Sequence, residues 1–448
     1  MESQGKFNKR VYRSLIYLAI PTVIEHIMST LLQYVDTAMV GHLGENATAA
    51  VSTTTTINWL AGSIPYALGI AVLASIAKES GAGNTEKTRK ITVCACYLTF
   101  ICGMTLMLIC TFLSPYIPIW MNAKSEIRKS ATSYFLIISL SMVFRTAEIV
   151  FSAAMRAVKN TKTPMLINLL CNVLNIVLNA LLIYKMNLGV NGAAIGSAIS
   201  YTICGIMMMI FARRQTLLKW ERKDFRFDKM RIHGILKIAI PAAGNNIASC
   251  LGYVIFAGMV SGMGTAVFAA HSIAVTAEEL FYIPGYGLRT ASSSLIGNAI
   301  GEGDDRKKNI TAKLSIEITI FMMIISGVIL FVFARPLMSI FTNSQRVAEL
   351  GSDMLKMIAF TEPFFGLMIA IEGIFYGMGK TREVFAVETS CMWGIRIVSA
   401  FLCTQVWHLS LYAVWRCMIA DNVCKAVILL IVYRIGQRQK GMPDRNNG

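Results

Sequence analysis

Long apolar segments, each able to cross a lipid bilayer, follow one another along almost the whole chain. A spanning helix needs about 20 predominantly apolar residues, and Gly or Pro within it is tolerated when neighbouring helices satisfy the freed backbone groups. The segments predict an all-α integral membrane protein. Twelve of them are delimited at residues 14–40, 49–77, 91–115, 131–157, 164–184, 190–212, 235–260, 267–299, 312–341, 350–378, 384–406 and 408–435.

The composition argues against a soluble protein and against a nucleic-acid partner. Only 15% of the residues are charged, whereas soluble globular proteins carry about 25%. The formal net charge of +17 would point to nucleic acid in a soluble protein. Here the basic residues lie in loops between apolar segments, where they set the orientation of a membrane protein. The 11 cysteines lie mostly inside apolar segments, which is typical of small hydrophobic core residues.

Basic residues are concentrated in the amino-terminal segment, in the even-numbered loops and in the carboxy-terminal tail. The odd-numbered loops are poorer in Lys and Arg, although the third and ninth carry some. Because cytoplasmic loops carry the excess of positive charge, both termini are expected in the cytoplasm. The low charge, short loops and compact length indicate a multi-pass protein of a bacterial inner membrane.

The second half of the chain repeats the first, and we call the separation from Pro21 to Pro241 the repeat offset. IPTVIEHIMSTLLQYVDTAMV from Ile20 corresponds to IPAAGNNIASCLGYVIFAGMV from Ile240, and GAGN from Gly81 corresponds to GEGD from Gly301. Six helices repeat after an even number of crossings, so the copies are related by a pseudo-two-fold axis along the membrane normal, as in transporters with alternating access. The expected parts are a six-helix lobe at 1–212, a basic cytoplasmic linker at 213–234, and a second six-helix lobe with a basic tail at 235–448.

Two helices of the first lobe each carry polar residues on one face. Glu25 and Asp36 are 11 residues apart in the first helix, which places them about 20° from eclipsed. The first and fifth helices both start at the cytoplasmic side. Asp36 and the end of the fifth helix are therefore expected to share a pocket in the outer half of the membrane. Hydrogen bonding that only holds the bundle together is the alternative, although two carboxylates in one helix favour a wet cavity. The fifth helix contributes a single face of four asparagines, Asn168, Asn172, Asn175 and Asn179.

The eighth segment holds a second acidic feature, Glu278 and Glu279, near mid-span. Glu278 follows Asn58 by the repeat offset, so the two are expected at equivalent places in the two lobes. Adjacent helical residues point about 100° apart, so both glutamates need not face the cavity. A buried ion pair of Glu278 with Arg289 or Arg396 is the alternative to an ion-binding role.

No motif indicates an enzyme. The chain lacks GxxxxGK[ST] and HExxH, and it lacks GxSxG. Its 5 histidines are scattered, so a membrane-embedded enzyme built on a His/Asp/Glu cluster is not supported. We therefore expect no enzymatic activity and no cofactor, and transport that is driven by an ion gradient.

Five stretches of the chain are characteristic, namely QYVDTAMVGHLG, AMRAVKNTKTPMLINLLCNVLNIVLNALLI, GVNGAAIGSAIS, AVTAEELFYIPGYGLRTASSSLIGNAIGEGD and MWGIR. Together they resemble the multidrug and toxic compound extrusion (MATE) family. The resemblance covers nearly the whole chain and both repeats, and it implies two six-helix lobes around a V-shaped central cleft. It further implies an antiporter that exports cationic or amphipathic organic compounds in exchange for H⁺ or Na⁺, with membrane lipids around it. The cavity lies within one chain, so a monomer suffices.

The resemblance also implies roles for individual positions. Asp36 matches the first-helix aspartate used for ion coupling, and Pro21 matches the proline at which that helix bends. Asn172 and Asn175 match polar positions of the amino-lobe cavity, and Glu278 matches a carboxylate of the carboxy lobe. A flippase for a lipid-linked saccharide precursor, from the same superfamily, is the alternative function. It would need a cationic cavity for phosphate, and the main cations at mid-span are Arg289 and Arg396.

One departure from the family pattern bears on the coupling ion. Where several members carry an aspartate after NVLNIVL, this chain has Asn179, which removes a negative charge and weakens the expectation of a two-carboxylate Na⁺ site. Asp36 and Asn175 are the candidate ligands of a metal cation, because carboxylate and amide oxygens suit hard cations. The expected ion-coupling residues are Asp36, Glu278, Asn175 and Asn179. The expected cavity residues are Glu25, Gln33, Tyr34, Asn168, Asn172, Glu279 and Arg396.

The proposed coupling step acts on Asp36. Protonation of Asp36, or cation binding to it, neutralises a carboxylate in a low-dielectric pocket. This change of charge alters the relative stability of outward and inward arrangements, with the bent first helix as the bistable element. A cationic substrate and the coupling ion would then compete for the same negative charge.

Overall fold

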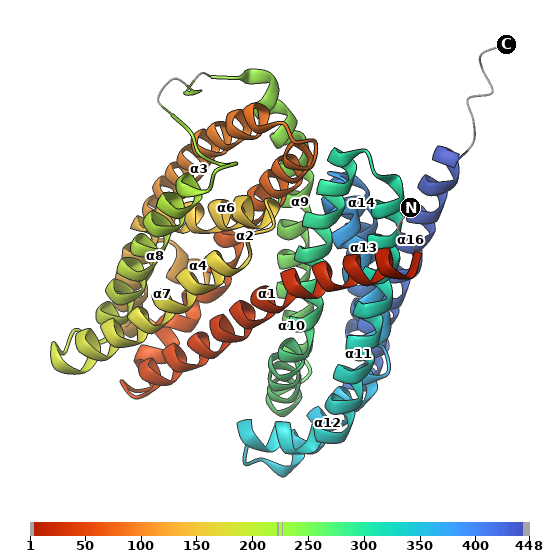
Figure 1. Ribbon diagram of the computed structural model, residues 1–448. Helices are drawn as coiled ribbons and strands as arrows, with labels where there is room; N and C mark the ends of the chain where they lie inside the picture. The colour runs from red at the N-terminus through yellow and green to blue at the C-terminus, as the bar shows by residue number, and fades with distance from the viewer. Residues whose placement is uncertain (1–3, 222–223, 226, 442–448) are drawn as a thin grey trace. The chain divides into compact units, whose positions relative to one another are not determined.

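The computed structural model describes residues 4–221, 224–225 and 227–441, which form helices and loops without a strand. Residues 222–223 and 226 of the expected linker, and the tail from 442, lie outside this range. The first half contains α1 (Gln4–Gly41), α2 (Glu45–Gly81), α3 (Thr85–Leu113), α4 (Ile117–Trp120), α5 (Ser125–Leu140), α6 (Met142–Ala157), α7 (Lys162–Ala180), the π-helical turn η1 (Leu181–Lys185) and α8 (Gly189–Arg214) (Figure 1). The second half contains α9 (Lys229–Ser261), α10 (Thr265–Glu302), α11 (Asp305–Phe341), α12 (Gln345–Ala359), α13 (Glu362–Gly377), α14 (Thr381–Cys391), the π-helical turns η3 (Met392–Ile397) and η4 (Leu402–Val406), α15 (Val398–Phe401) and α16 (Leu411–Gly441).

The twelve expected segments all coincide with helices. Nine described helices are long and apolar enough to span a membrane, or up to eleven if each of two bent pairs is one span. The twelfth segment is α16, which has 31 residues but carries Arg416, Asp421 and Lys425 within its apolar stretch. Most helices extend beyond the apolar windows, because hydropathy marks the part in hydrocarbon whereas a helix continues into the polar interface.

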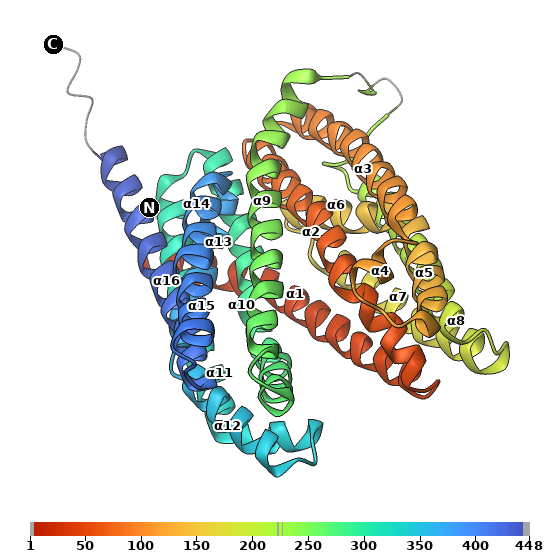
Figure 2. The ribbon, with the colours of Figure 1, turned by 180° about the vertical axis from the view of Figure 1, so that it is seen from behind.

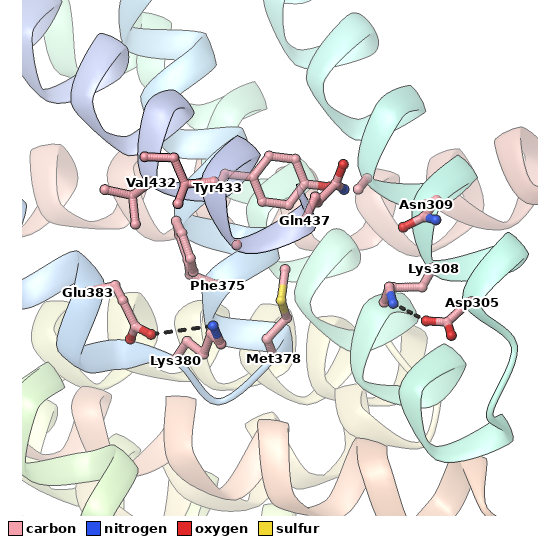
Figure 3. A pocket seen from close by; sticks show the side chains of 13 residues that line it. Asp305, Lys308, Asn309, Phe375, Met378, Lys380, Glu383, Val432, Tyr433 and Gln437 are labelled. Atoms are coloured by element: carbon pink, nitrogen blue, oxygen red, sulfur yellow. Dashed lines mark hydrogen bonds and ion pairs between the residues drawn. The ribbon is translucent and has the colours of Figure 1, made fainter. Parts of the chain in front are cut away.

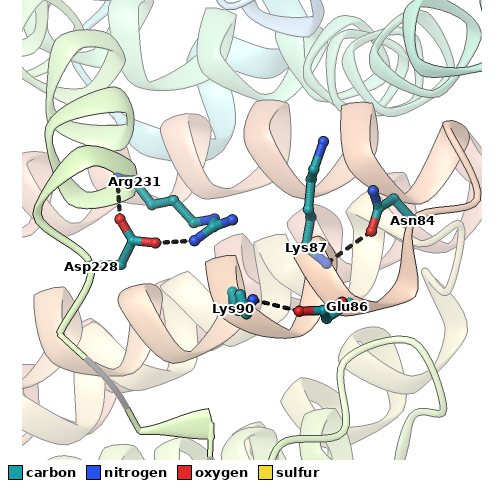
Figure 4. A network of polar contacts seen from close by, with 6 residues as sticks. All are labelled: Asn84, Glu86, Lys87, Lys90, Asp228 and Arg231. Atoms are coloured by element: carbon teal, nitrogen blue, oxygen red, sulfur yellow. Dashed lines mark hydrogen bonds and ion pairs between the residues drawn. The ribbon is translucent and has the colours of Figure 1, made fainter.

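Side-chain caps show why two helices begin outside the apolar windows (Figure 4). α3 starts at Thr85, where the Asn84 side-chain oxygen accepts the backbone N–H of Lys87 at 3.1 Å, as an N-cap asparagine does. α9 starts directly after Asp228, whose carboxylate accepts the backbone N–H of Arg231 at 3.1 Å and also pairs with its guanidinium. Polar residues at the loop thus set the helix starts.

Two of the expected spans are bent helix pairs, which the apolar pattern does not reveal. α5 and α6 meet at 49°, and α12 and α13 meet at 57°. The breaks fall at Ser141 and Thr361, and each hydroxyl donates to the carbonyl three residues earlier at 2.8 Å. Such hydroxyl-to-backbone bonds compete with the regular helical pattern and bend helices.

The backbone confirms the internal repeat. Left-handed glycines recur at the repeat offset, with φ of 104° at Gly44 and 117° at Gly264, and of 70° at Gly83 and 68° at Gly303. Positive φ favours glycine because it has no Cβ. The bends at Ser141 and Thr361 are separated by the same offset, and the π-helical turns η1 and η4 match it to within one position. The two halves therefore share turns and bends as well as sequence.

The described residues divide into two compact units. We call 20–246 with 297–304 the amino-terminal unit, and 4–19 with 247–296 and 305–441 the carboxy-terminal unit. Each unit has its own apolar core, drawn mainly from α2, α3, α6 and α8 in the first and from α9 to α12, η3, α15, η4 and α16 in the second. Within the carboxy-terminal unit, α13 lies beside α14 and α16 (Figure 2). The lobe boundaries expected from the repeat stay a prediction.

α1 passes from one unit to the other between Ala19 and Ile20, directly before Pro21. The helix continues through Pro21, although proline removes a backbone donor and weakens the helix there. This place suits the hinge expected at Pro21. The earlier part of α1 packs inside the carboxy-terminal unit, where a buried cluster joins Leu15, Leu18, Ala19, Leu288, Ala291 and Leu295.

The described part of the linker is folded against the amino-terminal unit. Leu218 and Trp220 are buried, and the Trp220 ring stacks on Phe151 with ring centroids 5.8 Å apart. Phe225 meets Tyr97 edge to face, also at 5.8 Å. The expected basic linker therefore contributes apolar side chains to a core as well as connecting two segments.

A reciprocal glycine contact holds the ends of α2 and α10 together inside the amino-terminal unit. A Cβ on Gly81 would lie 2.0 Å from the carbonyl oxygen of Asn298, and a Cβ on Gly301 would lie 1.8 Å from that of Lys78. Gly301 is the repeat counterpart of Gly81, and Asn298 is that of Lys78. The two contacts are therefore the same contact made twice. They are supported by the Asn298 amide, which donates to the Ala157 carbonyl at 2.9 Å.

We expect Gly81→Ala and Gly301→Ala each to destabilise the protein by about 1–3 kcal/mol, because the added methyl overpacks a backbone contact. Thermal unfolding of the detergent-solubilised protein measures the effect. Gly258→Ala is the matched control, since a Cβ there would meet nothing within 4 Å and alanine favours the helix. Equal unfolding temperatures for all three variants would contradict the contact.

Candidate functional site

Two parallel helices, α1 and α7, bring the polar residues of the amino-terminal unit together in two layers. Asn168 meets Glu25, and Asn179 meets Asp36, each across 143 residues of sequence. The equal separation shows that both helices run in the same direction and advance equally between the layers, by roughly 16 Å. The structure thus brings Asp36 and Asn179 into contact, at the shared depth that the sequence predicts.

The first layer is an ion pair. Oε1 of Glu25 accepts a hydrogen bond from the Arg156 guanidinium at 2.5 Å and another from the Asn168 amide at 2.5 Å. The side-chain oxygen of Asn168 in turn accepts a hydrogen bond from the Cys204 thiol at 3.1 Å. The side chains of Glu25 and Arg156 are only 10% and 15% exposed. The negative charge expected to line the substrate cavity is therefore neutralised, and this geometry favours a structural role for Glu25.

The second layer holds Asp36 through amides alone. Oδ1 of Asp36 accepts a hydrogen bond from Nδ2 of Asn179 at 2.9 Å. The same Nδ2 also donates a hydrogen bond to Oδ1 of Asn175 at 3.1 Å. Nδ2 of Asn175 donates to the Ser197 hydroxyl at 3.2 Å. Among the described residues, no Lys, Arg or His lies within ion-pair distance of Asp36. Asp36 is thus a half-buried carboxylate with neutral hydrogen-bond partners.

Two glycines of α8 allow this chain of hydrogen bonds to form. A Cβ on Gly196 would lie 2.1 Å from Oδ1 of Asn179, and a Cβ on Gly192 would lie 2.9 Å from the carbonyl of Leu182. Small residues four apart let membrane helices approach closely, so α8 lies against α7 and Ser197 reaches Asn175. The GVNGAAIGSAIS stretch contained this GxxxG signal, although sequence reasoning did not connect it with the asparagines.

Sequence reasoning missed the other polar side chains around Asp36. Tyr134 of α5 and Tyr201 of α8 lie close enough to Asp36 for electrostatic interaction. The Arg145 guanidinium lies 5.1 Å from the centroid of the Tyr201 ring. These residues come from separate helices, so no spacing along the chain ties them to α1. They add two phenol groups, each able to donate or accept, to the surroundings of the carboxylate.

The remaining expected residues of the amino-terminal unit differ in burial. Gln33 is exposed, and its backbone carbonyl accepts the Thr37 hydroxyl at 2.8 Å. Tyr34 and Asn172 are half-buried, and within the described part of the chain Nδ2 of Asn172 has no hydrogen-bond partner. Their contribution to a substrate cavity stays a prediction.

In the carboxy-terminal unit, Glu278 is buried and Glu279 is exposed, so the two adjacent residues do point apart. Oε1 of Glu278 has no hydrogen-bond partner within the described residues, and neither does either carboxylate oxygen of Glu362. The two buried carboxylates interact electrostatically. Glu362 received no role from the sequence, and it belongs with Glu278, because paired carboxylates in a dry site take up a proton or a cation.

Arg396, from the turn η3, is held in a buried ion cluster. Its Nε lies 2.8 Å from Oδ2 of Asp421, and its NH2 group donates to Asn422 at 2.9 Å. Lys425 contacts the same Asp421 oxygen at 2.8 Å. Arg396 therefore pairs with Asp421, and no ion pair with Glu278 forms among the described residues. Because Arg396 and Lys425 share one carboxylate, this buried cluster keeps one positive charge.

The second repeat carries different chemistry at the positions that correspond to the first-repeat site. Phe256 is the repeat counterpart of Asp36, and Arg396 directly follows the counterpart of Asn175. In the carboxy-terminal unit the Arg396 guanidinium lies 5.8 Å from the centroid of the Phe256 ring, which is a cation–π distance. Where the first repeat holds a carboxylate that can accept a cation, the second therefore holds a built-in cation.

Comparison with known proteins agrees with this architecture. A family model described as MatE matches residues 21–181 and 241–402, so its two copies start one repeat offset apart. A probable multidrug resistance protein NorM from Thermotoga maritima is 27% identical over 437 residues, which cover 96% of this chain and 94% of that protein.

Solved structures show the same fold. A MOP-superfamily transporter from Pyrococcus furiosus superposes with a TM-score of 0.91 at 21% identity, covering 99% of this chain and 100% of that one. A MATE transporter from Vibrio cholerae gives a TM-score of 0.91 at 18% identity, covering 97% and 98%. These are two-lobed, all-α proteins with twelve helices. The chain therefore belongs to the MATE family, and it is a multi-pass cell-membrane transporter rather than an enzyme.

Proposed function

We propose that the protein is a secondary active antiporter that exports organic cations in exchange for protons, with Asp36 as the coupling carboxylate. One observation carries the proposal. Asp36 is held by an amide and has no basic partner among the described residues, whereas Glu25 on the same helix is neutralised by Arg156. A carboxylate with neutral partners takes up either a proton or a cationic substrate, and this alternation is what exchange requires. The multidrug resistance name of the Thermotoga maritima relative supports an organic substrate.

The hydrogen bonds favour a proton over Na⁺ as the coupling ion. The Asn179 NH₂ group donates to both Asp36 and Asn175, so it stands where a metal ion would otherwise bridge the two oxygens. No group of three or more His, Cys, Asp or Glu residues able to hold a metal occurs in the described ranges. A proton on Asp36 needs only one free oxygen, whereas Na⁺ needs several oxygen ligands.

The coupling step follows from the strength of one hydrogen bond. The bond from Asn179 to an ionised Asp36 is charge-assisted, and bonds of this kind are roughly twice as strong as neutral ones. Protonation of Asp36 weakens the link between α1 and α7. The part of α1 after Pro21 then becomes freer to move, and the balance between two arrangements of the helix shifts.

The buried pair of Glu278 and Glu362 serves as a second proton-binding site in this proposal. Among the described residues, no Lys, Arg or His forms an ion pair with either carboxylate, and the Arg396 that interacts with Glu278 is held by Asp421. We further place both termini in the cytoplasm, from the charge of the loops, and take a monomer as the working unit.

The flippase alternative receives little support from the arginines. A cationic cavity for phosphate would need several cations that are unpaired and reachable. Arg289 pairs with Glu372 at 2.8 Å, and Arg396 pairs with Asp421 at 2.8 Å. Because Asp421 also contacts Lys425, one positive charge is left over there, but it lies in a cluster whose side chains are at most 7% exposed.

Asp36→Asn is expected to lower proton-driven ethidium transport in proteoliposomes by roughly tenfold or more, because the variant cannot alternate between charged and neutral forms. The side chain keeps its shape, so folding should be retained. Transport is measured with a pH gradient and with a Na⁺ gradient, each imposed alone.

The matched control is Glu45→Gln, which removes an exposed carboxylate from the first turn of α2 and should leave transport unchanged. Normal proton-driven transport by Asp36→Asn would contradict the role of Asp36. Transport by the unmodified protein that follows the Na⁺ gradient alone would contradict proton coupling.

Asn179→Asp is expected to create a sodium site, because it places a second carboxylate within hydrogen-bond distance of Asp36, and paired carboxylates attract a cation. Sodium chloride should raise the unfolding temperature of this variant above its value in choline chloride of equal ionic strength, by ligand linkage. The unmodified protein should show no such difference. An equal response of both proteins to sodium would mean that Asn179 does not exclude the metal.

A further inference from the structure

A pocket of about 520 Å³ lies inside the carboxy-terminal unit, and neither Glu278 nor Glu362 lines it (Figure 3). It is enclosed by the first turns of α11, by the junction of α13 and α14, and by the last turns of α16. These three places lie in or beside two of the even-numbered loops and the carboxy-terminal tail, all of which carry basic residues. Pockets of this volume hold small molecules or headgroups, and neither ion coupling nor the expected cavity uses this one.

Two lysines bring positive charge to the pocket. Lys308 of α11 has a side chain only 16% exposed, and its acidic partner Asp305 is 81% exposed. An ion pair with so exposed an acid is weak, so the partly buried Lys308 keeps much of its capacity for another anion. Lys380 enters the pocket beside the start of α14 and lies 3.5 Å from Glu383. Figure 3 shows the two lysines on separate elements with Met378 between them.

A hydroxyl and an apolar wall complete the pocket. The Tyr433 oxygen accepts the Gln437 amide at 2.5 Å, which leaves its own O–H free to donate to a ligand. The Tyr433 ring meets Phe375 edge to face, with centroids 6.3 Å apart. Ile435 lines the pocket and is 51% exposed. The lining thus includes an exposed apolar side chain, which an acyl chain can contact.

We propose that this pocket binds a phospholipid of the leaflet on the side of the basic loops, with the phosphate held by Lys308, Lys380 and Tyr433. Phosphate accepts strong hydrogen bonds from ammonium groups, and the apolar side near Ile435 takes the start of an acyl chain. The basic residues Arg434 and Arg438 on α16 add attraction to an anionic leaflet. The site concerns lipid binding, so it stands apart from the transport proposal.

Native mass spectrometry of the full-length protein in detergent tests the site with dioctanoyl phosphatidylglycerol as the probe. We expect the double variant Lys308→Gln/Lys380→Gln to bind the lipid roughly tenfold more weakly, because it loses two charge-assisted contacts. Tyr433→Phe should weaken binding less. Lys313→Gln is the matched control, since this lysine of the same helix is 76% exposed and does not line the pocket.

Three results would overturn the proposal. The first is equal lipid binding by the double variant and the unmodified protein. The second is displacement of the lipid by an equal concentration of glycerol 3-phosphate, which would make the site one for soluble phosphates. The third is equally tight binding of dioctanoylglycerol, which would mean that the phosphate is not recognised. If the double variant does not fold, as judged by circular dichroism, unchanged binding by Tyr433→Phe and by each single lysine variant would overturn it.

Discussion

Hydrocarbon offers no hydrogen-bond partner, and this constraint decides how every polar group in the chain is arranged. Backbone groups are satisfied within helices, and hydroxyls such as those of Thr92 and Thr146 donate to the carbonyl four residues earlier. The charged groups find partners on other helices, as Glu25 does with Arg156. Asp36 differs from Glu25 on the same helix, because its hydrogen-bond partner is an amide and no described basic residue pairs with it.

The sequence predicted the helices well, because a long apolar run marks a span whatever lies around it. It did not predict the bends at Ser141 and Thr361, since a hydroxyl that bonds to its own helix leaves no trace in hydropathy. The contact between Asp36 and Asn179 could be predicted from the sequence, because the depth of residues along two parallel helices determines which of them face each other. The partner of Glu25 could not be predicted in the same way, because Arg156 lies in the last turn of α6, next to a loop, where a basic residue is expected to set orientation.

The two repeats share one helical pattern but differ in the charged side chains that they carry. Turns, bends and left-handed glycines coincide between the halves, so the backbone tolerates little change. The side chains near these positions differ, because the counterpart of Asp36 is Phe256, whose ring lies beside the Arg396 guanidinium. A scaffold held by backbone geometry can thus carry a carboxylate with neutral partners in one half and a buried cation cluster in the other.

The glycine contact between α2 and α10 has the form of an isologous interface. Gly81 touches Asn298, Gly301 touches Lys78, and each partner is the counterpart of the other. Two identical subunits that pair about a two-fold axis form their interface in this way. The chain therefore preserves, within one covalent molecule, a surface of the kind that would let a half-length protein assemble with itself.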